Sequence, residues 1–194
     1  MKKYFILMCS TYFLMSCGQE VNTAEEVDGV APADHRIFIT SSVHTGNLGS
    51  INAANTICDN LAKAAGLTRI YVAILSAGET RPATSLGFTG GVYIVDSNQT
   101  AHLVVASGVD LWLAEDKQLL NRINVNENGA TVSETPWTGT VVEGAGGVDN
   151  CSDWLSDSSS VNGFHGSSDQ FDDRWVENTT SACNVTHPLF CISQ

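Results

Sequence analysis

Residues 183–194, CNVTHPLFCISQ, place two cysteines eight positions apart at the carboxyl-terminal end of the chain. Within this stretch, PLFCIS (188–193) is a short run rich in apolar and aromatic side chains, which predicts a strand. Chain termini usually fray unless they are tied into the fold. A strand that carries Cys191 at this place therefore predicts a terminus fastened to the core by a disulfide.

A helix further up the chain offers a partner for this strand. GSINAANTICDNLAKAAGL (49–67) has its small and apolar residues at helical spacing, with Ser50 able to cap its start and Gly66 able to end it. On this helix Cys58 faces the core. The residues expected on the inward face are Ile51, Ala54, Cys58, Leu61, Ala62 and Ala65. The runs on either side, RIFITSS (36–42) and RIYVAILS (69–76), predict strands.

The cysteines beyond the amino-terminal region number four, and an even count in an exported chain predicts two disulfides. The close CxxC pairs typical of a zinc site are absent. By count alone, three pairings are possible. The expected helix and terminal strand favour Cys58–Cys191, which leaves Cys151–Cys183. The second bond would clamp the 31-residue stretch 152–182, which is rich in Ser, Asp, Asn and Gly, and long loops of this kind are typically functional or disordered.

The amino-terminal sequence MKKYFILMCSTYFLMSCGQE predicts export. Two lysines precede an apolar stretch too short to span a bilayer, so residues 1–16 are expected to be a signal peptide. Residues 14–18, LMSCG, resemble a bacterial lipobox, in which the signal is cut before the cysteine and that cysteine, here Cys17, receives lipid. The alternative is an ordinary signal peptide with an incidental cysteine.

The remaining chain divides into an acidic segment and one domain. Residues 17–35 lack a hydrophobic period and contain Pro32, so we expect a flexible tether, or else an arm lying on the domain. Residues 36–194 have a composition that suits a single globular domain. Without the signal, 7 basic and 21 acidic residues give a charge of 7 − 21 = −14. Such an acidic chain lacks the basic patch of a nucleic-acid binder.

Four segments together resemble the endostatin-like domain of bacterial surface lipoproteins, of which the leptospiral outer-membrane proteins are the best known. They are RIFITSSVHTGNLGSINAANTICDNLAKAAGL (36–67), PWTGT (136–140), NCSDWLSDSSSVNGFHG (150–166) and SACNVTHPLFCISQ (181–194). The resemblance implies an α+β, C-type-lectin-like fold with a twisted antiparallel sheet, two helices, a long loop region and two nested disulfides. Its pairing, outer with outer and inner with inner, agrees with the bonds expected above.

The resemblance also implies a class of function and a location. Some members of the family bind host extracellular-matrix proteins, plasminogen or complement regulators, so we expect a non-enzymatic adhesin or receptor anchored by lipid at the bacterial outer membrane or cell surface. Heparin binding is not favoured, because the domain scatters seven basic residues among 16 acidic ones. Zinc ligands are not carried over either, since His35 and His44 lack the family's spacing.

The contact surface is expected in the loop between the inner cysteines. Its candidate ligand-binding residues are Trp175, Asp169, Asp172, Asp173 and Asn178. Trp175 is considered as an exposed contact because acidic residues surround it, whereas Trp137 and Trp154 are expected in the core. From residue 143 to residue 177 the chain has eight acidic residues and one arginine, which favours a basic partner.

Two other functions are considered. A calcium-dependent glycan-binding lectin would need carboxylates around a hard cation, and Asp169, Asp172, Asp173 and Glu177 are the weak candidates. The Glu-Pro-Asn and Gln-Pro-Asp motifs of such lectins are absent, and no cofactor is expected. A structural envelope lipoprotein without a soluble ligand is the other alternative. Catalysis is not expected, because Gly-x-Ser-x-Gly and HExxH motifs are absent and His165 is interpreted as polar surface.

Overall fold

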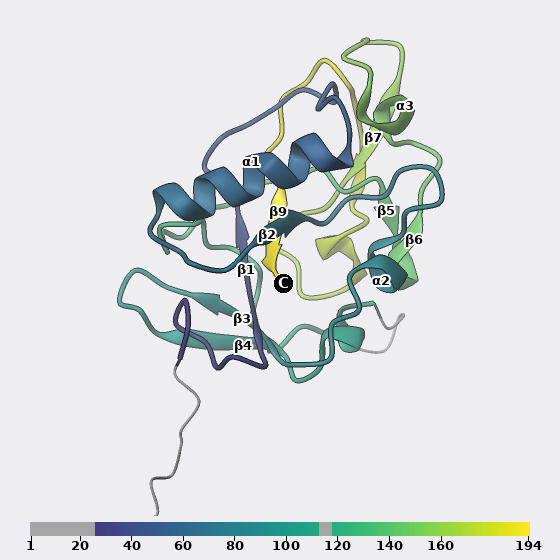
Figure 1. Cartoon of the computed structure of the whole chain (residues 1–194). Coiled ribbons are helices and arrows are strands. Elements are labelled where there is room, and N and C mark those ends of the chain that lie inside the picture. The colour runs from purple at the N-terminus through teal and green to yellow at the C-terminus, as the bar shows by residue number, and fades with distance from the viewer. Residues whose placement is uncertain (1–25, 113–117) are drawn as a thin grey trace, which may run out of the picture.

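A computed structural model describes residues 26–112 and 118–194 of the protein, so the expected signal peptide (1–16), the expected lipidation site Cys17 and residues 18–25 lie outside the described residues. The fold is mixed α+β, with one helix of several turns lying across a sheet (Figure 1). Five strands form this sheet in the order β2-β9-β1-β3-β4. They are β1 (His35–Ile39), β2 (Tyr71–Ala73), β3 (Val92–Val95), β4 (Ala101–Val105) and β9 (Phe190–Ser193).

The carboxyl-terminal strand lies in the interior of the sheet. β9 runs antiparallel to both β1 and β2, and its backbone is hydrogen-bonded on both sides. Side chains alternate between the two faces of a strand, so Ile37 and Ile39 on β1 point to one face and Phe38 points to the other. On β9 the same alternation places Cys191 opposite Phe38 in the register and on its face. The terminus is therefore part of the core, as its sequence predicted.

The helix α1 (Ile51–Ala64) covers the Phe38 face of the sheet. The Ser50 hydroxyl accepts a hydrogen bond from the amide of Ala53 at 3.1 Å, which caps the start of the helix. Gly66 follows the helix at a φ of +80°, and the amides of Gly66 and Leu67 bond back to carbonyls of the last turn. Both expected ends are confirmed. The helix buries Ala54, Cys58 and Ala62 completely.

The opposite face of the sheet is covered by a second core rather than by a helix. Aromatic side chains from distant parts of the sequence fill it, with Trp175 packed against Trp112 at 5.7 Å and against Phe190 at 5.4 Å between ring centroids. Aliphatic residues from all four long strands, β1, β3, β4 and β9, complete it. The sheet is thus buried on both faces near β1 and β9.

Both disulfides form the expected pairs. Cys58 on α1 is bonded to Cys191 on β9, and Cys151 is bonded to Cys183. Gly46 passes against the second bond, and a Cβ atom at this position would lie 2.2 Å from the sulfur of Cys151. Two disulfides are typical of proteins that fold outside the cytoplasm.

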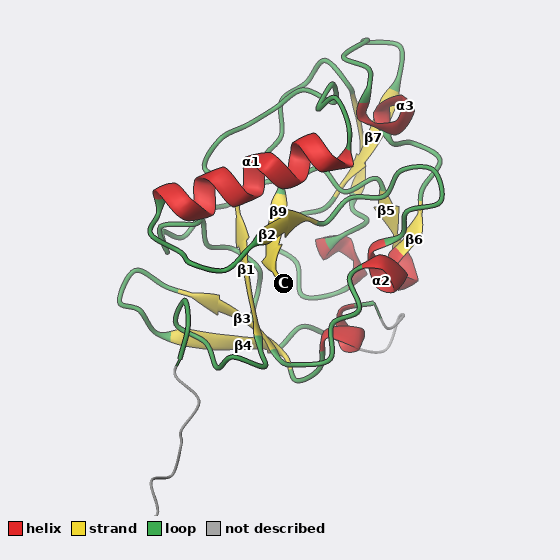
Figure 2. Ribbon diagram, in the orientation of Figure 1, coloured by secondary structure: helices red, strands yellow, loops and turns green. Residues whose placement is uncertain are grey.

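The stretch between Cys151 and Cys183 is more regular than its composition predicted. It contains a hairpin of β7 (Asn162–His165) and β8 (Thr179–Ala182), whose loop carries the short helix η3 (Asp173–Trp175). Around it lie the small hairpin of β5 (Thr140–Val141) and β6 (Ala145–Gly146) and the short helices η1 (Gly108–Leu111) and η2 (Val142–Gly144). Loops nevertheless make up much of this half of the molecule (Figure 2). The expected long loop region is therefore a hairpin with ordered connections.

An unusual turn begins this region. All four residues of α3 (Cys151–Trp154) have positive φ angles, between 53° and 64°, so the turn is left-handed. Such a conformation costs roughly 1–2 kcal/mol for each residue with a side chain. The turn is fixed by the disulfide, by the Asn150 side chain, which accepts from the amide of Asp153 at 2.9 Å, and by the Trp154 indole, which donates to the carbonyl of Ser76 at 2.9 Å.

Two expectations about the architecture need correction. The sheet is mixed rather than antiparallel, because β1 and β3 are parallel neighbours, and the long connection through α1 and β2 makes this possible. The second expected helix is reduced to short pieces: α2 (Pro82–Ser85) has four residues and is followed by Gly87 at a φ of +56°.

No helix of the described residues is long and apolar enough to cross a membrane.

The domain also begins earlier than residue 36. Residues 27–30 form a turn against the domain, and the Asp28 carboxylate accepts hydrogen bonds from the amides of Thr68 and Arg69 and from the hydroxyl of Tyr71. Burial alone would raise the pKa of Asp28, but these hydrogen bonds outweigh it and lower the pKa. Residues 26–34 are therefore a docked arm, whereas 17–25 lie outside the described residues.

The bond between Cys58 and Cys191 closes a loop of 133 residues, so its removal should have a large effect on stability. In the chain-entropy view, the double variant Cys58→Ala/Cys191→Ala loses about 5 kcal/mol in free energy of unfolding. Urea denaturation of the oxidised proteins measures this difference. A loss below about 1 kcal/mol, with the other disulfide intact by peptide mass spectrometry, would contradict the role assigned to this bond.

Candidate functional site

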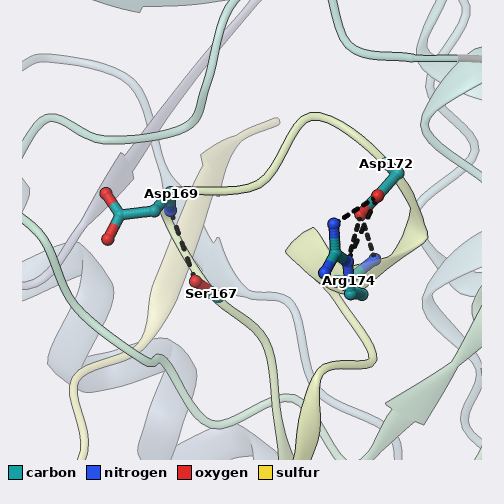
Figure 3. A network of polar contacts seen from close by, with 4 residues as sticks. All are labelled: Ser167, Asp169, Asp172 and Arg174. Atoms are coloured by element: carbon teal, nitrogen blue, oxygen red, sulfur yellow. Dashed lines mark hydrogen bonds and ion pairs between the residues drawn. The ribbon is translucent and has the colours of Figure 1, made fainter.

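The candidate contact residues lie along the loop between β7 and β8, where η3 interrupts the chain. Asp172 caps η3, because its carboxylate accepts from the amide of Arg174. The same carboxylate forms a two-pronged ion pair with the Arg174 guanidinium, with contacts of 2.8 and 2.9 Å (Figure 3). The hydrogen bond from Arg174 lowers the pKa of Asp172. Both side chains are in contact with solvent, so this pair contributes little to stability.

Trp175 is not a contact residue. Its side chain is 2% exposed and belongs to the core under the sheet, so the expectation of an exposed tryptophan is wrong. The physical reason is the turn of η3, which directs this side chain inward while its neighbours Asp172, Asp173 and Arg174 remain in contact with solvent. Trp137 and Trp154 are fully buried, as expected.

The remaining candidates do not gather at one point. The Asp169 carboxylate is bonded to the hydroxyl of Ser133, and its own amide donates to Ser167 at 3.4 Å, with the carboxylate directed away from Asp172 (Figure 3). Asn178 is exposed beyond the buried Trp175. Only Asp172 and Asp173, which are adjacent in sequence, share one surface.

The calcium candidates are likewise engaged separately. Glu177 accepts a hydrogen bond from the amide of Val142 at 2.7 Å, Asp172 is paired with Arg174, and Asp169 is bonded to Ser133. Within residues 26–112 and 118–194, no group of three or more His, Cys, Asp or Glu side chains is arranged to hold a metal ion. The structure does not bring Asp169, Asp172, Asp173 and Glu177 together.

An exposed aromatic residue that the sequence reasoning missed lies beside the two aspartates. Phe171 is 37% exposed, and the guanidinium of Arg122 lies over its ring at 4.5 Å from the centroid. Leu120, which is 61% exposed, is held nearby because the amide of its neighbour Leu119 donates to the carbonyl of Phe171 at 2.7 Å. We call these residues the acidic–aromatic surface: Leu120, Arg122, Phe171, Asp172 and Asp173.

The acidic–aromatic surface is not a pocket. The cavity beneath it, lined by Trp112, Phe171 and Trp175 among others, has a volume of only about 20 Å³. This is close to the space that one water molecule needs, whereas pockets for organic ligands measure roughly 300–1,000 Å³. The surface therefore offers area and charge to a partner but no enclosed space to a small molecule.

Two larger cavities lie elsewhere. One, of about 590 Å³, lies beside the docked arm at Asp28 and Arg36, and the other, of about 510 Å³, lies between α1 and α2. Arg36 is 2% exposed and donates to the carbonyls of Asp28 and Glu127, both at 3.2 Å. The carboxylates of Asp28 and Glu127 already accept hydrogen bonds from protein donors. These residues tie the arm and the 126–130 turn to β1.

His165 occupies a place that its sequence context did not indicate. It lies on β7 and is 4% exposed, so the interpretation as polar surface is wrong. No sequence signal indicated this, because side chains alternate along a strand and the apolar Phe164 would have been expected inside, whereas the structure buries Gly163 and His165 and leaves Asn162 and Phe164 more exposed.

Residues 41–171 match a family described as "Protein of unknown function (DUF1554)". The match includes Cys58 and Cys151 and ends at Phe171, so it stops short of both partner cysteines. A search of curated proteins found no match.

The contrast between Trp175 and Phe171 can be measured. Trp175→Ala should lower the free energy of unfolding by about 3–5 kcal/mol, because it empties a packed core. Phe171→Ala, the matched control on the surface, should cost about 1 kcal/mol or less. Denaturant titrations of the two variants check this. Equal losses would contradict the assignment of one residue to the core and of the other to the surface.

Proposed function

Because the chain belongs to the family described as "Protein of unknown function (DUF1554)", we propose its function from its own geometry: a non-enzymatic binding module that contacts a macromolecular partner through the acidic–aromatic surface. The observation that carries this proposal is an exposed Phe171 ring among acidic side chains, over a cavity of water size. Large aromatic residues anchor many protein interfaces, and a flat surface suits a partner with an extended face.

The charge of the surface indicates the chemistry of the partner. Within the surface itself, Arg122 stacks on Phe171 and Arg174 neutralises Asp172, so the excess of negative charge comes from the wider stretch 143–177, which has eight acidic residues and Arg174. A partner with a basic patch and an apolar residue that can pack on Phe171 fits this arrangement. Association should be faster at low salt, because exposed charges steer the encounter and salt screens them.

The fold and the partner class rest on the resemblance to endostatin-like domains. An α+β domain with nested disulfides Cys58–Cys191 and Cys151–Cys183 is compatible with a C-type-lectin-like domain, which we propose as the finer description of the fold. The same resemblance indicates host extracellular-matrix proteins, plasminogen or complement regulators as the class of partner. No observation on the described residues favours the calcium-dependent lectin, since its candidate ligands are engaged separately.

The binding proposal predicts saturable binding of the purified full chain to a member of this partner class. The variant Phe171→Ala/Asp172→Asn should weaken it roughly tenfold or more, because it removes both the anchor and a charge. Raising the salt from about 0.05 to 0.5 M should also weaken it. Biosensor binding to matrix proteins, plasminogen, complement regulators and glycans is the measurement.

A matched control separates this surface from other exposed residues. Ile70 is 63% exposed and Glu79 is also exposed, and both lie outside 143–177, so Ile70→Ala/Glu79→Gln makes the same kind of change elsewhere and should leave binding unchanged. Binding that survives Phe171→Ala/Asp172→Asn would refute the placement of the site. Absence of binding to every partner would favour a structural envelope protein.

We also propose that the protein is a lipoprotein anchored through Cys17 at the bacterial outer membrane or cell surface, with 17–25 linking the lipid to the docked arm. Cys17→Ala should move the protein from the detergent phase to the aqueous phase, because it removes the only attachment point of the lipid. Cys9→Ala, within the signal, is the control and should partition like the original protein. Unchanged partitioning of Cys17→Ala would contradict the anchor.

A further inference from the structure

Two histidines stack on each other inside the disulfide-rich half of the domain. His165 lies on β7, and His187 lies between Cys183 and Cys191. Their ring centroids are 4.7 Å apart with planes inclined by 21°, and the two residues are 4% and 6% exposed. The Trp137 ring covers the pair, 4.2 Å from His187 and 6.3 Å from His165. None of the functions proposed above uses this pair.

The hydrogen bonds assign the neutral tautomer of both rings. Nδ1 of His165 lies 3.0 Å from the carbonyl of Gly166, and Nδ1 of His187 lies 2.6 Å from the carbonyl of Thr135. A carbonyl oxygen only accepts, so each Nδ1 carries a hydrogen, and in the neutral ring Nε2 then holds the lone pair. Nε2 of His187 is buried without a hydrogen-bond partner, as fits a neutral ring.

Protonation of this pair has a clear cost. A proton on Nε2 of His187 would create a buried N–H without an acceptor. Two protonated rings at 4.7 Å would in addition repel each other in a poorly solvated place. The segments packed against the two histidines carry five other charged or titratable residues: His44, Glu134, Asp149, Arg174 and Glu177.

None of these five groups compensates the positive charge that a protonated His165 or His187 ring would carry. The His44 ring is bonded to the hydroxyl of Ser42, and the Glu177 carboxylate is bonded to the amide of Val142. Arg174 is paired with Asp172, Glu134 is exposed, and the half-buried Asp149 forms no ion pair with either histidine. Among the described residues, the one histidine–carboxylate ion pair is His102–Asp96, on the β3–β4 hairpin.

We propose that the stacked pair His165–His187 is a pH-sensitive latch, which holds β7 and the segment 183–189 together around Trp137 at neutral pH and loosens both in acid. The backbone of Trp137 forms a bridge with His165 on one side and with Leu189 on the other, and the stacked rings add a direct contact between the two segments. The latch is local, because disulfides fix both ends of the segment that carries His187: Cys183 is bonded to Cys151, and Cys191 is bonded to Cys58. Both segments can loosen around Trp137, but neither can leave the domain. This inference does not depend on what the acidic–aromatic surface binds.

The direction of the pH dependence follows from burial. Burial lowers the pKa of both rings, against the effect of the Gly166 and Thr135 carbonyls, and the charge of His165 lowers that of His187 further. In the released form the rings regain an ordinary pKa near 6.5. The latch is therefore fully stable above about pH 6.5 and loses stability as the pH falls below this value, since the released form binds more protons.

Hydrogen exchange on the full chain tests the latch. Between about pH 7.5 and pH 5, protection factors of the hydrogen-bonded amides of Phe164, Gly166, His187 and Leu189 should fall roughly tenfold or more, because one pH unit of altered pKa is a tenfold change in equilibrium. Amides of β1 and β9 should keep their protection. In the same pH range, NMR titration of the native protein should show that burial lowers the pKa of both His165 and His187 below the ordinary histidine value, and the two variants below assign their signals apart from that of His44, whose pKa burial also lowers.

Matched variants complete the test. His165→Asn and His187→Asn keep a donor for the Gly166 and Thr135 carbonyls but cannot be protonated, so each should flatten the pH profile of these amides. His102→Asn changes a histidine outside the pair and should leave the profile as it is. Ordinary titration of both native rings, or an unchanged acid response in both variants, would overturn the proposal. The native titration decides the matter if the variants fail to fold.

Discussion

The position of β9 between β1 and β2 is the constraint on which the rest of the structure depends. Its backbone completes the hydrogen bonds of both neighbours, and its side chains enter both cores, with Cys191 on the helix side and Phe190 on the other. The bond to Cys58 adds a covalent tie to α1. The segment that directly precedes β9, residues 183–189, is therefore held at its carboxyl-terminal end by a strand that cannot shift without disturbing both cores.

The sequence predicted the parts of this frame that depend on local chemistry. Ser50 and Gly66 mark the ends of α1 because capping is decided within one turn, and Cys58 faces inward because helical spacing fixes its direction. The parallel pairing of β1 with β3 could not be predicted in the same way, since it depends on where a chain of more than 50 residues returns. The docking of Asp28 on Thr68 and Tyr71 is a similar long-range contact.

The candidate site was predicted less well, for a related reason. The acidic neighbours of Trp175 indicated exposure, but a single turn of η3 separates an inward tryptophan from outward aspartates. Phe171 gave no signal because the residue that stacks on its ring, Arg122, lies 49 residues earlier in the sequence. His165 and His187 are 22 residues apart, and only the pairing of distant segments around Trp137 brings them together. Composition therefore located the acidic region but not its geometry.

The placement of β9 also orders the events by which the domain is made. Residues 190–193 leave the ribosome after every other strand, yet they fill the middle of the sheet. Until they arrive, β1 and β2 have no common neighbour, and the sulfur of Cys58 has no partner across 133 residues. Such non-local contacts make folding slow. The nascent chain thus stays uncommitted until β9 has been made, which is the condition a protein needs if it is to be threaded across a membrane before it folds.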